Sequence, residues 1–192
     1  MSKEKLIEMA QMNKEHAEKG TMTLVDDVVK IPAKNYYDPE RWNLSVEKHE
    51  INNCYSYALD TIENDLLEKR QPGEKCNREF QYDCQNLEEM IRCDFPSIQR
   101  IESIDTPIPC DHYRIALVLD DSGEHLDYHF YRQDVDGYWS HKTGHDPITN
   151  LDASGNRIKN PEKIDRNYDK KNNDHFNYGK FCGYFSVKYN GD

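Results

Sequence analysis

The sequence predicts an α+β protein, with helices in its first half and an antiparallel β-meander in its second half. Two observations support this class. Apolar residues follow helical spacing after Cys54 and again over residues 84–93, whereas residues 113–142 alternate runs of β-branched and aromatic residues with turn sequences. Helices that precede a run of strands are typical of α+β folds, in which the helices pack on the sheet.

Residues 1–49 are predicted to form an N-terminal helix followed by an extended segment. The helix should lie within residues 1–20 and end at Gly20, and Pro32 and Pro39 favour an extended chain after it. The first 20 residues contain no apolar core of a signal peptide, so we expect no export signal and a cytoplasmic location, with export by a specialised machine or packaging in a virion as the alternatives. Residues 50–192 are expected to form the functional part of a single-domain protein.

Asn53 predicts the start of the next helix, because asparagine is a favoured N-cap residue. One helix face then carries Tyr55, Ala58, Leu59, Ile62 and Leu66. This helix should continue to about Arg70, where the sequence "QPG" breaks it, and a second helix is expected at residues 84–93. Cys54 would therefore lie in a first helical turn, where the macrodipole favours a thiolate with a pKa below the roughly 8.5 of a free cysteine.

Four strands are expected in the second half, separated by the turn sequences "DDSGE" and "DVDG" and by a long polar loop. They cover about residues 113–120, 126–133, 138–142 and 181–188. The loop extends over residues 143–177.

The composition disfavours several classes of partner. The net charge of −11 argues against binding to nucleic acid or to anionic membranes through bulk charge. No run approaches the roughly 18 apolar residues of a membrane span. The oligomeric state stays open.

The six cysteines are expected to be free thiols, because the chain shows no export signal. Cys76, Cys84 and Cys93 lack the close spacing of structural zinc ligands, and Cys110 with His112 is the one tight pair. We therefore predict no bound metal and no cofactor.

Two histidines, His129 and His141, flank the "DVDG" turn and are twelve residues apart. A hairpin centred near Val135 would place them opposite each other, with Cβ atoms about 5 Å apart. A thiol nucleophile needs a nearby base, and that base needs a group that orients it. Cys54, His129 and His141 are thus candidates for nucleophile, base and orienting residue.

The stretches "NNCYSYAL", "YRIALVLDD", "HFYRQDVDG" and "GYWSHKTG" resemble the papain-like NlpC/P60 cysteine peptidases over about residues 50–145 and the closing strand. The resemblance implies a papain-like fold, with N-terminal helices packed on the β-meander. It also implies a cysteine hydrolase, a peptidase or amidase, that cleaves a peptide or amide substrate through an acyl-enzyme. Cys54 would be the nucleophile, His129 the base and His141 the orienting residue.

Several assignments stay open. Besides the Cys54 backbone N–H, the donors to the oxyanion are expected among the side chains just upstream, which are His49, Asn52 and Asn53. If the hairpin register differs, the third position of the triad falls to Asp134, Ser140 or Asp146. The alternative function is a non-catalytic papain-like scaffold that acts as a binding or structural protein, for instance in a virion or effector complex. Acyl transfer to or from lipid is a third, less supported reading.

Overall fold

The computed structural model describes residues 35–43, 50–62, 69–76, 80–122, 126–168 and 176–189. The chain divides into two units, Met1–Ile31 and Pro32–Asp192, and every described residue belongs to the second. The helix expected within residues 1–20 and the segment that follows it to residue 34 lie outside the described residues. In the described part, no helix has the length and apolar character needed to cross a bilayer.

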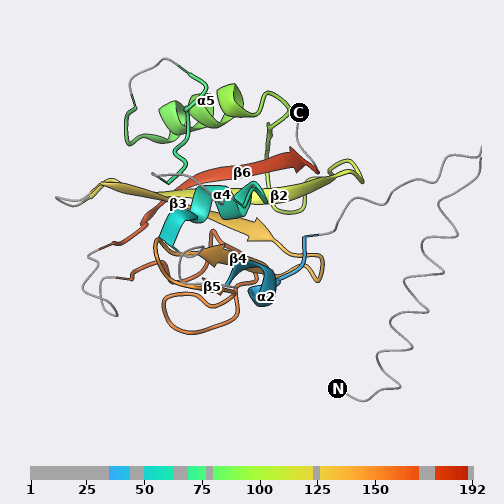
Figure 1. Cartoon of the computed structure of the whole chain (residues 1–192), viewed down its shortest axis with the longest axis vertical. Coiled ribbons are helices and arrows are strands. Elements are labelled where there is room, and N and C mark those ends of the chain that lie inside the picture. The colour runs from blue at the N-terminus through green and yellow to red at the C-terminus, as the bar shows by residue number, and fades with distance from the viewer. Residues whose placement is uncertain are drawn as a thin grey trace, which may run out of the picture. The chain divides into compact units, whose positions relative to one another are not determined.

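The second unit is built on one six-stranded sheet in which all neighbouring strands are antiparallel (Figure 1). In the order β1-β6-β2-β3-β4-β5, the strands are Gln99–Ile101, Lys180–Lys188, His112–Asp120, Asp127–Gln133, Trp139–Lys142 and Ile148–Thr149. The four predicted strands are confirmed to within one residue at each end. The short edge strands β1 and β5 were not predicted, because two or three residues carry too little pattern to identify a strand.

The described helices are α2 (Pro39–Trp42), α4 (Cys54–Ala58) and α5 (Cys84–Asp94). The mixture of helices and antiparallel sheet confirms the α+β class. The helix predicted at residues 84–93 is confirmed, with Asp83 as its N-cap. The prediction that the helix after Cys54 continues to Arg70 is wrong, because α4 ends at Ala58.

Asp60 explains the early end of α4. Its backbone has a φ of 53°, a left-handed conformation that an α-helix does not contain. Its carboxylate accepts hydrogen bonds from Arg132 at 2.9 Å and from Arg41 at 2.7 Å. These ion pairs with distant residues hold the chain in a turn where the local pattern favoured more helix.

The sheet separates two hydrophobic cores. Alternate residues of β3 face opposite sides, so that Tyr128 and Phe130 join the core under α4 and α5. Tyr131 joins the other core, together with Ile158 and Tyr178 from the long segment between β5 and β6. In Figure 1, α5 lies above the sheet and the segment after β5 lies below it. Cys54 belongs to the first core, and the His129 ring packs against Tyr131 and Tyr178 of the second core.

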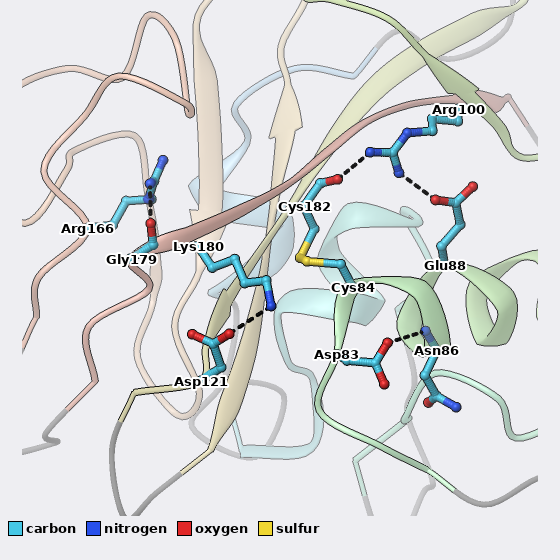
Figure 2. Close-up of a disulfide and its surroundings, with 10 residues drawn as sticks. All are labelled: Asp83, Cys84, Asn86, Glu88, Arg100, Asp121, Arg166, Gly179, Lys180 and Cys182. Atoms are coloured by element: carbon cyan, nitrogen blue, oxygen red, sulfur yellow. Dashed lines mark hydrogen bonds and ion pairs between the residues drawn. A yellow bond between two sulfur atoms is a disulfide. The ribbon is translucent and has the colours of Figure 1, made fainter.

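Two disulfides contradict the expectation that all six cysteines are free. Cys84, at the start of α5, is joined to Cys182 in β6, which lies 98 residues away (Figure 2). Cys76 is joined to Cys93 at the other end of α5. Cys54 and Cys110 are the free thiols. The sequence spacing gave no sign of these pairs, because the packing of α5 on the sheet brings the cysteines together.

Candidate active site

Asn53 positions Cys54 at the first residue of α4. Its Oδ1 accepts hydrogen bonds from the backbone N–H groups of Tyr55 and Ser56, at 3.1 and 3.0 Å, as an N-cap does. Its Nδ2 donates to the carbonyl oxygen of Arg70 at 2.7 Å. Both ends of this side chain therefore hold the helix start in place, which leaves Asn53 poorly suited to the predicted role of oxyanion donor.

The Cys54 thiol is buried and neutral. Its Sγ lies 4.0 Å from the carbonyl oxygen of Tyr128 in β3, the strand that packs against α4. Burial, and after it the carboxylate of Asp127, raises the pKa of the thiol to about 12. The lowered pKa expected from the helix start is thus not found. A helix of only five residues supplies a weak macrodipole, and here the cost of burying a thiolate outweighs it.

His129 and His141 are brought together as predicted, although through a different register. His141 pairs with Tyr131, so that His129 lies diagonally across the hairpin and not directly opposite. The turn centres on Asp136 instead of Val135, because the N–H of Asp134 closes it onto the carbonyl oxygen of residue 138. The two imidazoles still lie on one face, and His129 Nε2 is 2.8 Å from His141 Nδ1.

The hydrogen bonds of this pair determine its tautomers. His141 Nε2 lies 3.0 Å from the carbonyl oxygen of Leu151, which only accepts, so this nitrogen carries the proton. Burial lowers the pKa of His141 to about 4, and the neutral ring then accepts at Nδ1. His129 Nε2 must therefore donate to it. Burial also lowers the pKa of His129 well below its usual value, so its Nδ1 is the unprotonated nitrogen.

Tyr178 holds the His129 ring from the side. The two rings stack with their centroids 5.1 Å apart and an interplanar angle of 29°. The Tyr178 hydroxyl donates to Asp127 Oδ2 at 2.6 Å, which fixes the tyrosine in turn. Sequence reasoning missed Tyr178 and Asp127, and Tyr178 lies in a segment with no periodic pattern that could have identified it.

A cavity of about 250 Å³ adjoins both Cys54 and His129. Lys69, Asp127 and Tyr178 also line it. Among the described residues, no hydrogen bond joins the Cys54 thiol to His129. The thiol packs on the Tyr128 side of β3, whereas the His129 ring packs among the rings on the other side.

The alternative third residues lie elsewhere. Ser140 faces the opposite side of β4 from His141, where its Oγ donates to Asp134 at 2.8 Å and lies 2.6 Å from the Tyr57 hydroxyl. Asp146 accepts a hydrogen bond from Thr143 in the turn that follows β4. None of the three has a described hydrogen bond to His129, whose described partner is His141.

Of the other predicted oxyanion donors, Asn52 is buried beside Cys54, and His49 lies outside the described residues. Sequence reasoning also missed Lys142. This residue follows His141 in β4 and is buried. Its Nζ donates to the carbonyl oxygens of Gly144 and Asp146, and burial lowers its pKa to about 8. Lys142 thereby holds the turn that borders the cavity. The described residues contain no group of His, Cys, Asp or Glu arranged to hold a metal ion.

No family model and no solved structure matches the chain. The protein named insoluble matrix shell protein 1, from Ruditapes philippinarum, is 36% identical to it over 130 residues, which are 68% of this chain and 80% of that protein. The chain belongs to this family.

Proposed function

We propose that this protein is a papain-like cysteine hydrolase that cleaves a peptide or amide bond through an acyl-enzyme. One observation carries the proposal, the hydrogen bond from His129 to His141. It fixes the His129 tautomer so that Nδ1 is the basic nitrogen, on a residue that borders the same cavity as Cys54. A base oriented by a third group, and a thiol at a helix start that borders the same cavity, are the parts that thiol catalysis requires.

The reaction then follows from the tautomers. His129 Nδ1 takes the thiol proton as Cys54 Sγ bonds to the carbonyl carbon of the substrate. The C–N bond breaks, and the amine leaves with the proton from His129. A water molecule then gives a proton to His129 Nδ1 and attacks the carbonyl carbon of the thioester. The C–S bond breaks, the acid is released, and the proton returns to sulfur.

The resting thiol is neutral and packs on the opposite side of β3 from the His129 ring, so the mechanism requires substrate binding to bring the base and the thiol together. Catalytic hydrogen bonds are often long without substrate and shorten in the complex. The backbone N–H of Cys54 is the proposed donor to the oxyanion, since the Asn53 side chain is occupied by the helix cap.

Acylation by p-nitrophenyl acetate tests the proposal without knowledge of the natural substrate. Mass spectrometry should find the acetyl group on Cys54 in preference to the exposed Cys110. The Cys110→Ser variant should react like wild type, whereas His129→Ala should slow acetylation of Cys54 by about 100-fold, as loss of a general base does. Acetylation of Cys110 alone, or a rate that does not depend on His129, would refute the proposal.

The second candidate is a non-catalytic structural protein of a matrix. Two observations favour it: the raised pKa of the Cys54 thiol and membership of a family that includes an insoluble matrix shell protein. A Cys54 that stays unreactive in the acetylation experiment, while Cys54→Ala folds with unchanged stability, would make this candidate the preferred one.

The two disulfides indicate the kind of compartment in which the protein is found, whichever of the two functions it has. Disulfides form and persist mainly in oxidising compartments. We therefore propose an oxidising compartment in place of the cytoplasm that was expected from the first 20 residues. Mass spectrometry of alkylated, unreduced protein from its native source would test this, and free thiols at the four bridged cysteines would contradict it.

A further inference from the structure

A second cavity, also of about 250 Å³, adjoins the cavity that borders Cys54. The two share Asp127, Gly144 and Tyr178 as lining residues. We call the second cavity the aromatic pocket and define it by Asp127, Asp146, Tyr168, Phe176 and Tyr178. The shared residues make it a neighbouring compartment of the candidate active site.

Three aromatic rings form one side of the aromatic pocket. Phe176 stacks on Tyr178 with an interplanar angle of 20°, and Tyr168 meets Tyr178 edge to face at 6.1 Å between centroids. The pocket is therefore bordered by rings in two different orientations. The face of an aromatic ring carries negative charge density, which attracts a cation that lies within about 6 Å of the ring centre.

The carboxylates of Asp127 and Asp146 supply negative charge to the same pocket. The Asp146 side chain accepts a hydrogen bond from Thr143 at 3.1 Å, which holds it in the turn after β4. Asp127 accepts from the Tyr178 hydroxyl at 2.6 Å. Both carboxylates are thus oriented by hydroxyl groups of other lining residues.

The two nearby lysines, Lys69 and Lys142, do not line the aromatic pocket. Lys69 lines the Cys54 cavity and not the aromatic pocket, and its Nζ lies 3.1 Å from His145 Nε2. His145 itself lines the aromatic pocket, and its Nε2 accepts from the Lys69 ammonium group, which only donates. Lys142 does not line the pocket either, and its Nζ is held by two carbonyl oxygens.

We propose that the aromatic pocket binds the basic side chain of a peptide, lysine or arginine. The rings of Tyr168 and Phe176 bind the cation, since Tyr178 is stacked against His129 and Phe176, and Asp146 pairs with the cation at the open side. The net charge of −11 on the chain favours the approach of a cationic partner. The role of the aromatic pocket as a substrate subsite rests on the proposed hydrolase function. Its role as a binding site for a basic side chain does not depend on hydrolysis.

Peptide binding to the full-length Cys54→Ala variant tests the site without catalysis. The probes are acetyl-Ala-Lys-Ala-amide and the same peptide with norleucine in place of lysine, which keeps the four-carbon chain but lacks the ammonium group. Isothermal titration calorimetry should find the lysine peptide bound about tenfold more tightly, as expected for a partly desolvated cation beside aromatic rings and a carboxylate.

Two variants test whether the preference for the lysine peptide arises in the aromatic pocket. Asp146→Asn keeps the hydrogen-bond acceptor but removes the charge, and it should reduce the preference for lysine about fivefold. Phe176→Leu removes a ring while retaining apolar volume, and it should also weaken the preference. Asp105→Asn removes an exposed charge that lies outside the pocket and should change nothing.

Equal affinity for the two peptides, tighter binding of norleucine, no binding of either, or a preference that survives both pocket variants would overturn the proposal. These outcomes are independent of hydrolysis, because the protein tested has no nucleophile. Failure of the acetylation experiment with retention of the lysine preference would leave a binding site for basic peptides without the hydrolase.

Discussion

Asp94, the last residue of α5, is expected to be one of the most important side chains for stability. It is buried and accepts three hydrogen bonds from parts of the chain that are distant in sequence. The Tyr55 hydroxyl donates to it at 2.7 Å, the N–H of Gly73 at 2.7 Å and the N–H of Lys75 at 2.9 Å. It thereby joins α5 to α4 and to the segment over residues 69–76, which supplies lining residues of the Cys54 cavity.

The cost of Asp94→Ala follows from these contacts. A hydrogen bond to a charged group contributes about 1.5–3 kcal/mol, and a buried donor left without a partner adds a desolvation penalty. Since such terms are not fully additive, we take the lower end for three bonds and expect a loss of about 4 kcal/mol. For a chain of this size, the melting temperature should fall by about 8–16 °C.

Asp83 provides a matched control at the other end of the same helix. Its side chain makes one described hydrogen bond, to the N–H of Asn86 at 2.8 Å, so Asp83→Ala should cost about 1 kcal/mol. Urea denaturation monitored by tryptophan fluorescence measures both losses with the disulfides intact. Hydrogen exchange adds a local measurement, because the amides of Gly73 and Lys75 should lose protection in Asp94→Ala alone. Equal stability losses in the two variants would refute the reasoning.

Three further predictions concern other features. Burial lowers the pKa of His129 and His141, that of His141 to about 4, so the stability gained from neutral imidazoles is present above about pH 6.5 and is lost as the pH falls toward 4. The melting temperature of the wild type should therefore fall more over this interval than that of the double His→Gln variant, and parallel curves would contradict this. Replacing Cys84 and Cys182 together by serine should cost about 4 kcal/mol in urea denaturation, because the bridge closes a loop of 98 residues; a loss below 1 kcal/mol would be inconsistent with the bridge. Gly183→Ala should cost about 1–3 kcal/mol, since its φ of 147° disfavours a side chain and an added Cβ would lie 2.8 Å from a guanidinium nitrogen; an unchanged melting temperature would count against this conformation.

Much of the fold was predictable because its signals are local. The strands around His129 and His141 are rich in aromatic residues, and turn sequences mark their ends. The N-cap at Asn53 and the helix over residues 84–93 also follow from short patterns. In each case the residues that determine the element lie within it.

The remaining features depend on contacts between distant residues. The end of α4 is determined by the ion pair of Asp60 with Arg132 in β3. The pairing register places His129 diagonal to His141, and this register depends on where the turn closes. Moving the centre of the turn by one residue changes which residues of the two strands lie opposite each other. The roles of Tyr178 and Asp127 beside the candidate base follow from the return of a long loop to the sheet. No local pattern in the sequence contains this information.

The Cys84–Cys182 disulfide closes a covalent ring that contains α5 and the five strands β1 to β5. A protease that cuts the exposed turn around His145 would open this ring without releasing a fragment. Both pieces would stay attached through sulfur, and the two halves of the candidate site, Cys54 on one piece and Tyr178 on the other, would not diffuse apart. Such a nicked molecule would migrate as an intact chain until a reducing agent separated its parts, so damage to this protein in an oxidising environment need not mean its dispersal.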